Sequence, residues 1–150
     1  MEYREAKVGR VIIVRFDNGD PLLRGIEEIA RKENISFATV TLLGALASAR
    51  MVTGPEDGAI PPKPIMYDFE EPREVLGSGT IIRSGVSHKV HLHISAGREG
   101  GGTTGCLRSG DKVFITVEAV ITEVVGPDVS KGFDEGSGCN ILRFNGPGAS

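Results

Sequence analysis

All three histidines of this chain and one of its two cysteines lie between residues 88 and 106. His88, His91 and His93 fall within six residues, and Cys106 follows thirteen residues after His93. Imidazole nitrogen and thiolate sulfur are ligands that suit zinc, which favours a tetrahedron. Three protein ligands leave one position open, as in catalytic zinc sites, whereas structural sites generally have four. The spacing therefore raises the hypothesis of a zinc site.

Strand parity selects two of these histidines. Residues 89–95 alternate polar and apolar side chains, which is typical of a strand with one buried face. His91 and His93 would then point the same way, and a glycine-rich loop over residues 98–105 could fold Cys106 back toward them. His88 has the opposite parity and is the alternative ligand if the strand twists or bulges. An exposed histidine pair without a metal, and a cysteine that is a small buried side chain, are the competing interpretations.

A carboxylate and three arginines are further candidates. Glu118 interrupts the apolar run "FITVEAV", so it could orient a zinc-bound imidazole, act as a general base, or simply lie on a solvated face in an ion pair. Arg83, Arg98 and Arg108 surround the histidines in sequence and could bind a small anionic ligand near the metal. Solvated surface arginines are the alternative.

The elements that must position these residues are mostly strands. Runs of β-branched and apolar residues predict strands over residues 9–16, 37–46, 47–54, 65–70, 74–83, 89–95, 111–125 and 139–144. Helical spacing predicts one amphipathic helix over residues 21–34, capped by Asp20 with Pro21 at its first position. Residues 55–64, which contain four prolines, predict a loop near a sheet edge, and residues 126–138 predict another loop.

These elements indicate the α+β (mixed α/β) class, with about seven strands and one principal helix. The length predicts a single domain over residues 1–150 with its core at about residues 9–144 and a frayed tail over the last six residues. In residues 113–121 the odd-numbered side chains, Ile115 included, should share one face.

Composition narrows the function classes. The formal net charge is −3, which argues against an extended nucleic-acid surface. No apolar run reaches the length of a membrane span, and there is no apolar signal segment at the start, so we expect a soluble, cytoplasmic protein. Two cysteines do not make a disulfide framework.

Several motifs in order resemble the PPC domain family, a domain of plants and prokaryotes that accompanies AT-hooks in plant nuclear proteins. They are "GRVIIVRFDNGDPLLRGIEEIARKENI", "LLGAL", "EVLGSGTIIRSG", "HLH" and "TGCL" with the following "TVEAVI". The resemblance implies a mainly antiparallel sheet with a helix packed on it, and a homotrimer. Family members often have histidine where this chain has Cys106, which is another zinc ligand. The R-G-R-P core of an AT-hook is absent.

Three functions are compatible with the sequence. The first is a stand-alone trimeric domain that binds zinc through His91, His93 and Cys106 and serves assembly or ligand sensing. The second is a small zinc-dependent hydrolase with Glu118 as general base. The third is a DNA-associated protein by analogy with the plant relatives, which the charge makes the least favoured.

Overall fold

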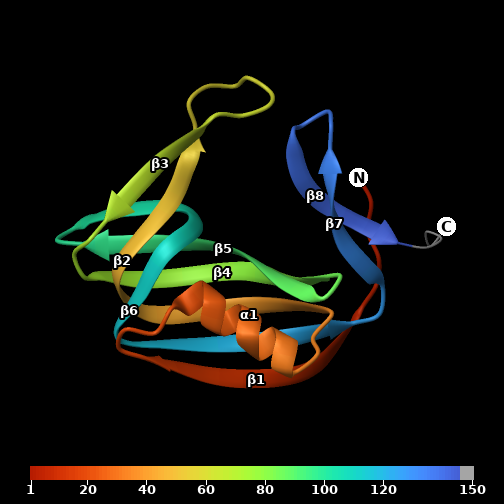
Figure 1. Cartoon of the computed structure of the whole chain (residues 1–150), viewed down its shortest axis with the longest axis horizontal. Helices are drawn as coiled ribbons and strands as arrows, with labels where there is room; N and C mark the ends of the chain where they lie inside the picture. Colours follow the sequence, from red (N-terminus) through yellow and green to blue (C-terminus); the bar gives the residue numbers. More distant parts are fainter. Residues whose placement is uncertain (146–150) are drawn as a thin grey trace.

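The computed structural model describes residues 1–145 of the chain, and the last five residues, which hold most of the predicted tail, lie outside the described part. Residues 1–145 form eight strands and one helix, which confirms the α+β class (Figure 1). In chain order they are β1 (Lys7–Asp17), α1 (Leu22–Lys32), β2 (Phe37–Pro55), β3 (Pro64–Phe69), β4 (Arg73–Ser84), β5 (Ser87–Arg98), β6 (Gly101–Val125), β7 (Asp128–Asp134) and β8 (Cys139–Asn145).

Antiparallel pairing builds a six-stranded sheet in the order β1-β6-β5-β4-β2-β3, and β6 also pairs with β2. The extra pairing closes β2, β4, β5 and β6 into a ring, with β1 and β3 at the outside. The two longest strands, β2 and β6, each pair with more than one neighbour along their length, because they bend between the lower and upper parts of the molecule (Figure 1). A separate two-stranded sheet contains β7 and β8.

Helix α1 packs on the ring through its apolar stripe, in which Leu22, Ile26 and Ala30 are fully buried. The prediction that Asp20 caps the helix with Pro21 at its first position is wrong, because Pro21 is the N-cap residue and the helix begins at Leu22. Asp20 accepts a hydrogen bond from the amide of Asp17, whereas the carboxylate of Asp111 on β6 accepts one from the Leu23 amide at 2.6 Å. A residue 88 positions away therefore satisfies one of the free donors of the first turn, which local sequence rules do not predict.

The core lies between the ring strands and α1, and strand alternation fills it. Val113, Val117, Ala119 and Ile121 of β6 are buried as predicted. Ile115 departs from this alternation: it is 67% exposed and has a φ of 60°. The pairing of β6 with β2 shifts register between Gly44 and Ala45, so the strand bulges here and turns Ile115 outward.

Three loop and strand predictions need correction. Residues 47–54 continue β2 instead of forming a separate strand, β7 occupies part of the predicted loop 126–138, and most of the glycine-rich segment 98–105 is strand. Gly105 shows why glycine is used there. A Cβ at this position would collide with the carbonyl oxygen of Val52, so the close approach of β2 and β6 requires a residue without a side chain.

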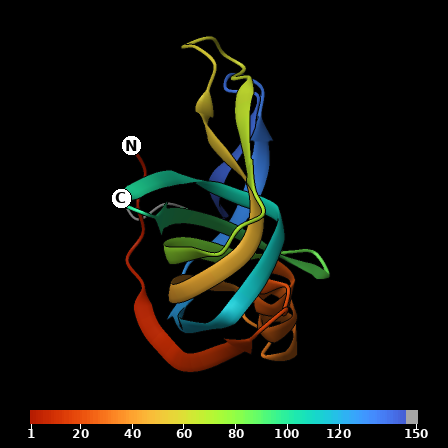
Figure 2. The ribbon, with the colours of Figure 1, turned by 90° about the vertical axis from the view of Figure 1, so that its left-hand side faces the viewer.

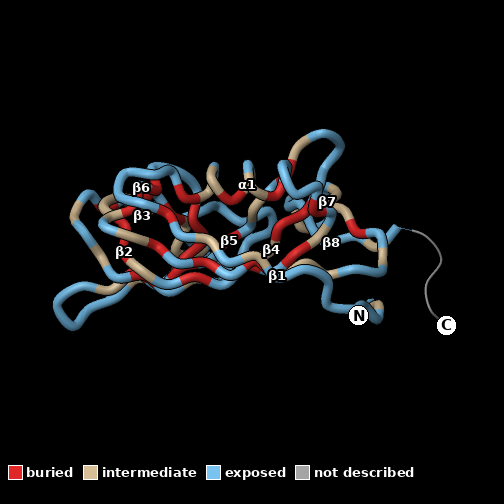
Figure 3. The backbone as a smooth tube through the Cα atoms, turned by 90° about the horizontal axis from the view of Figure 1, so that it is seen from below, coloured by how far each residue is buried: buried red, intermediate tan, exposed pale blue. Residues whose placement is uncertain are grey.

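Two hairpins project from the same end of the ring: β2–β3 with its proline-rich loop, and β7–β8 (Figure 2). The loop at residues 56–63 joins β2 to the edge strand β3, as predicted. The tips of the two hairpins are in contact: Gly138 lies so close to Pro61 that a side chain at residue 138 would collide with it. Buried backbone concentrates in the ring and α1, while the hairpins are mostly exposed (Figure 3). Among residues 1–145, no helix is long and apolar enough to cross a membrane.

Candidate metal centre

The two histidines of β5 form the first half of the centre. His91 and His93 both point outward, while Leu92 and Ile94 on the other face are buried at 0% and 1% exposure, so the parity argument holds. The Nε2 atoms of His91 and His93 lie 3.3 Å apart, and the rings meet edge to face with centroids at 5.0 Å. The two Nε2 atoms are therefore close enough to bind one metal ion together.

Cys106 completes the group through strand register instead of a folded-back loop. Glu99 and Gly100, both with positive φ, form a tight turn between β5 and β6. This turn places Cys106 directly opposite His93, and directly opposite residues of antiparallel strands share a face. The ligand atoms of His91, His93 and Cys106 all lie within 4.8 Å of one another.

Burial influences the protonation of these candidate ligands. It lowers the pKa of His91, and the positive charges of Lys131, His93 and Arg108 lower it further. The imidazole of His91 is therefore neutral at pH 7 and its lone pair is free for a metal. Burial also raises the pKa of the Cys106 thiol, against the opposing effect of Arg108 and Lys131. A metal that binds here must displace the thiol proton.

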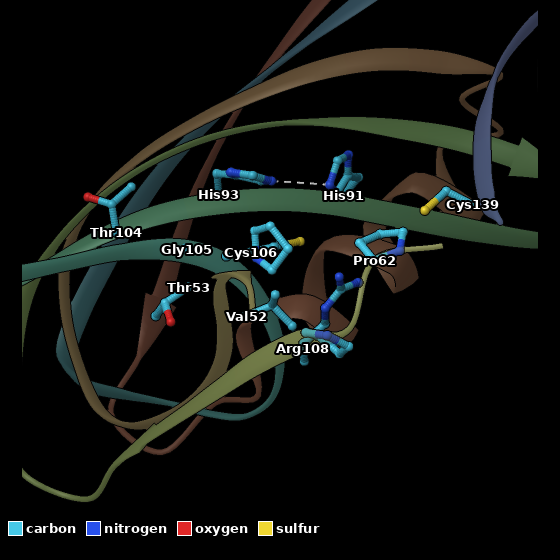
Figure 4. Close-up of a pocket in the computed structure, with 13 residues that line it drawn as sticks. Val52, Thr53, Pro62, His91, His93, Thr104, Gly105, Cys106, Arg108 and Cys139 are labelled. Atoms are coloured by element: carbon cyan, nitrogen blue, oxygen red, sulfur yellow. Dashed lines mark hydrogen bonds between the residues drawn. The ribbon is translucent and has the colours of Figure 1, made fainter. Parts of the chain in front are cut away.

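A pocket of about 640 Å³ opens above the three ligands, and we call it the metal-side pocket. The hairpins supply much of its wall, with Pro62 from the β2–β3 loop and Cys139 from β8 beside the histidines (Figure 4). Arg108 also lines it. The remaining lining residues are Val52, Thr53, Gly54, Pro55, Pro64, Thr104 and Gly105. Such a volume is typical of sites for small molecules.

The structure does not bring the other histidine or Glu118 into this group. His88 is buried at 7% exposure, and its Nε2 pairs with the carbonyl oxygen of Ile35 at 2.8 Å, so it ties β5 to the end of the α1 segment. Glu118 is exposed on β6, opposite Arg15 of β1 and Leu43 of β2, and is not among the residues lining the pocket. No contact with the cluster supports a role for Glu118 at the metal.

Of the three arginines proposed for an anion, only Arg108 faces the pocket. Arg83 donates a hydrogen bond to Asn34, and Arg98 pairs with Glu99. Sequence reasoning missed Lys131 and Cys139, because both lie on the β7–β8 hairpin, of which only β8 was predicted and whose approach to β5 is a long-range contact. The only sequence signal was a second cysteine in a chain that has two.

Comparison with known proteins agrees with this architecture. The family model of the Plants and Prokaryotes Conserved domain, abbreviated PCC or PPC, matches residues 3–125. The chain belongs to the PPC domain family. The matched range contains every motif on which the resemblance depends, and it ends with β6, so the β7–β8 hairpin lies beyond it. No curated protein matches the chain.

Solved structures show the same fold for this PPC chain. The metal-containing protein AF0104 of Archaeoglobus fulgidus is 26% identical with a TM-score of 0.84, over 95% of this chain and 99% of that one. A PPC protein of Pyrococcus horikoshii is 20% identical with a TM-score of 0.79, over 93% and 96%. A proposed DNA-binding protein of Bacteroides thetaiotaomicron is 20% identical with a TM-score of 0.77, over 93% and 97%.

Proposed function

We propose that this PPC domain binds one zinc ion per chain through His91, His93 and Cys106, with one coordination position left open toward the metal-side pocket. The observation that carries the proposal is the ligand geometry. In a tetrahedral zinc site two imidazole nitrogens lie about 3.3 Å apart, and nitrogen and sulfur about 3.6 Å apart. The Nε2 atoms of the two histidines are 3.3 Å apart, and the whole set spans at most 4.8 Å.

The ligand chemistry and one structural neighbour support this assignment. Two imidazoles and a thiolate suit zinc better than magnesium or calcium, which prefer oxygen ligands. The neighbour from Archaeoglobus fulgidus is described as a metal-containing protein and shares the fold over nearly the whole chain. The likeness to that protein supports a bound metal, and the donor set of this chain favours zinc.

The residues around the ligands favour binding over hydrolysis. A zinc ion with an open position can polarise a bound group. The described residues that line the metal-side pocket include no aspartate or glutamate, so no carboxylate stands ready as a general base. Imidazole nitrogens from strand β5 and the thiolate sulfur from strand β6 hold the metal, and the pocket admits a ligand beside it. Ligand sensing is therefore the role that the site supports best.

Metal analysis of purified variants tests the site. The wild-type protein should hold one zinc per chain, and the double variant His91→Ala, His93→Ala should hold none after dialysis against trace zinc. Cys106→Ser should lose most of the zinc, while the matched control Cys139→Ser should keep it, because the group within 4.8 Å includes only the first thiol. Undiminished zinc in the double variant would overturn the proposal.

We propose further that the chain assembles as a homotrimer through the outer face of its sheet. Ile13 of β1 is 83% exposed and lies opposite Val120, while Leu43 and Leu76 are opposite one another and are 52% and 66% exposed. These four neighbouring side chains form an apolar patch, and such patches on small proteins mark interaction sites. The number of subunits rests on the family resemblance.

Light scattering tests this assembly. The wild-type protein should have about three times the chain mass of 15.9 kDa at micromolar concentration. The double variant Leu43→Lys, Leu76→Lys places charges on the patch and should scatter as a monomer with an unchanged circular dichroism spectrum. A wild-type protein that is monomeric at these concentrations would reject the trimer.

A further inference from the structure

A second cavity of about 640 Å³ adjoins the metal-side pocket and shares His91, Arg108 and Cys139 with it. Three cationic side chains line it: Lys89 from β5, Arg108 from β6 and Lys131 from β7. We call it the cationic pocket. Among the described residues, neither pocket is lined by an aspartate or a glutamate, although the chain has three more acidic than basic residues. The concentration of positive charge here runs against the overall charge.

These charges are not neutralised by neighbours. Within residues 1–145, no carboxylate lies within ion-pair distance of Lys89, Arg108 or Lys131, and Arg108 differs in this from most other arginines of the described chain, which are paired. A concave surface that carries one sign of charge attracts ligands of the opposite sign.

We propose that the cationic pocket binds the phosphate of a small organic phosphate whose organic part extends into the metal-side pocket. Three cations match a phosphate monoester, which carries about two negative charges at neutral pH, better than they match a single carboxylate. The hydroxyl of Ser84 and the amide of Asn140 line the same cavity and can complete the hydrogen bonding of a tetrahedral anion. Arginine and lysine are the usual partners of phosphate.

The walls of the two pockets define the rest of the ligand. Val52, Pro55, Pro62 and Pro64 give the metal-side pocket an apolar wall, and Phe133 and Val90 contribute apolar surface to the cationic pocket. An apolar or aromatic body of modest size fits such walls. The placement of that body beside the metal rests on the proposed zinc site, whereas the phosphate contacts do not.

The β7–β8 hairpin supplies Lys131, Phe133 and Cys139 to these cavities. The family model ends at residue 125, before this hairpin begins. The phosphate pocket therefore depends on residues beyond the matched part of the chain. We expect it to be a property of this protein that the family membership does not imply.

Isothermal titration of the zinc-loaded full chain with phenyl phosphate tests the proposal, with benzoate as the matched monoanionic probe. Phenyl phosphate should bind at least about tenfold more tightly than benzoate. Arg108→Gln and Lys131→Gln should each weaken its binding about tenfold, as expected for loss of one charge-assisted hydrogen bond. Arg98→Gln is the matched control and should bind as the wild type does, because Arg98 lies outside both pockets.

Equal affinity for the two probes, or unchanged affinity in the Arg108 and Lys131 variants, would overturn the proposal. The same titration of EDTA-treated protein separates it from the zinc site. Binding that persists without metal and still needs Arg108 supports the phosphate pocket even where zinc analysis fails. Binding that vanishes with the metal while both variants bind normally means that phosphate is a metal ligand. Displacement of phenyl phosphate by a short DNA duplex at a lower concentration than by inorganic phosphate would assign the cations to a nucleic acid instead.

Discussion

The ring with α1 and the pair of projecting hairpins are built in different ways. The ring and α1 together hold the largest fully buried side chains, among them Leu22, Ile26, Leu92 and Ile121. The β7–β8 hairpin contributes Val129 as its only buried apolar residue within the described chain, at 8% exposure. Buried apolar area stabilises the ring and also the base of the β2–β3 hairpin, where Met51 and Phe69 are buried. Backbone pairing and a contact at the tips hold the β7–β8 hairpin, which is mostly exposed (Figures 1 and 3).

The candidate site is divided between these two regions. His91, His93 and Cys106 stand on β5 and β6 of the ring, so packing beneath them fixes their positions. Pro62, Lys131 and Cys139 come from the hairpins and cover the ligands from above. A rigid base is suited to metal ligands, which must hold their geometry, and a less strongly packed cover can admit and release a ligand.

The largest expected difference between the regions is in stability. Leu92 lies between the two histidines and is fully buried, so Leu92→Ala should lower the free energy of unfolding by about 2–5 kcal/mol. Ile65 on the edge strand β3 is 46% exposed, and Ile65→Ala should cost about 0.5 kcal/mol. Denaturant unfolding of both variants measures the contrast. Similar losses would show that the hairpins are as tightly integrated as the ring.

A smaller effect is expected where α1 is tied to the ring. Asp111 is 8% exposed and its carboxylate accepts the Leu23 amide, so Asp111→Ala should cost about 1–2 kcal/mol. Asp111→Asn keeps an acceptor and should cost less. Thermal unfolding at pH 7 gives both values. A loss in the alanine variant no larger than in the asparagine variant would mean that the cap contributes little.

The same carboxylate gives a pH dependence of known sign. Burial raises the pKa of Asp111 in the folded chain, against the opposing hydrogen bonds from backbone amides. Because the pKa of Asp111 is higher in the folded state than in the unfolded state, the folded state binds the proton more tightly. Protonation of Asp111 therefore stabilises the fold, and this stabilisation is complete below the usual carboxyl pKa. It is lost as pH rises through the raised value. Asp111→Asn should remove this part of the stability profile.

The smallest expected effect concerns the bulge in β6. Ile115 combines a β-branched side chain, a φ of 60° and 67% exposure. Glycine adopts this backbone region without strain, and little burial is lost, so Ile115→Gly should raise the free energy of unfolding by about 1 kcal/mol. Val113→Gly, at a buried position of the same strand, should lower it. Destabilisation of the first variant would show that Ile115 is covered in the assembled protein.

Local patterns were sufficient for most elements. Apolar alternation located the strands and the parity of His91 and His93, and helical spacing located α1. The loop predicted over residues 98–105 is wrong because glycine is typical of turns, whereas Gly105 lies in a strand and allows the close contact between β2 and β6. The loop predicted over residues 126–138 failed for a related reason. The strand β7 is short, contains Gly132 and has one buried residue, so its alternation is too weak to detect.

The sequence by itself determined the residue types that could bind a metal, the shared face of the two histidines and the family. Each of these depends on residue types or on spacing within one strand. Only the tertiary structure decided that Cys106 stands opposite His93, that Asp111 caps the helix and that Lys131 and Cys139 reach the histidines from the hairpin. Pairing register and contacts between distant segments follow from how all the strands close into one ring, and no local window of the chain carries that information.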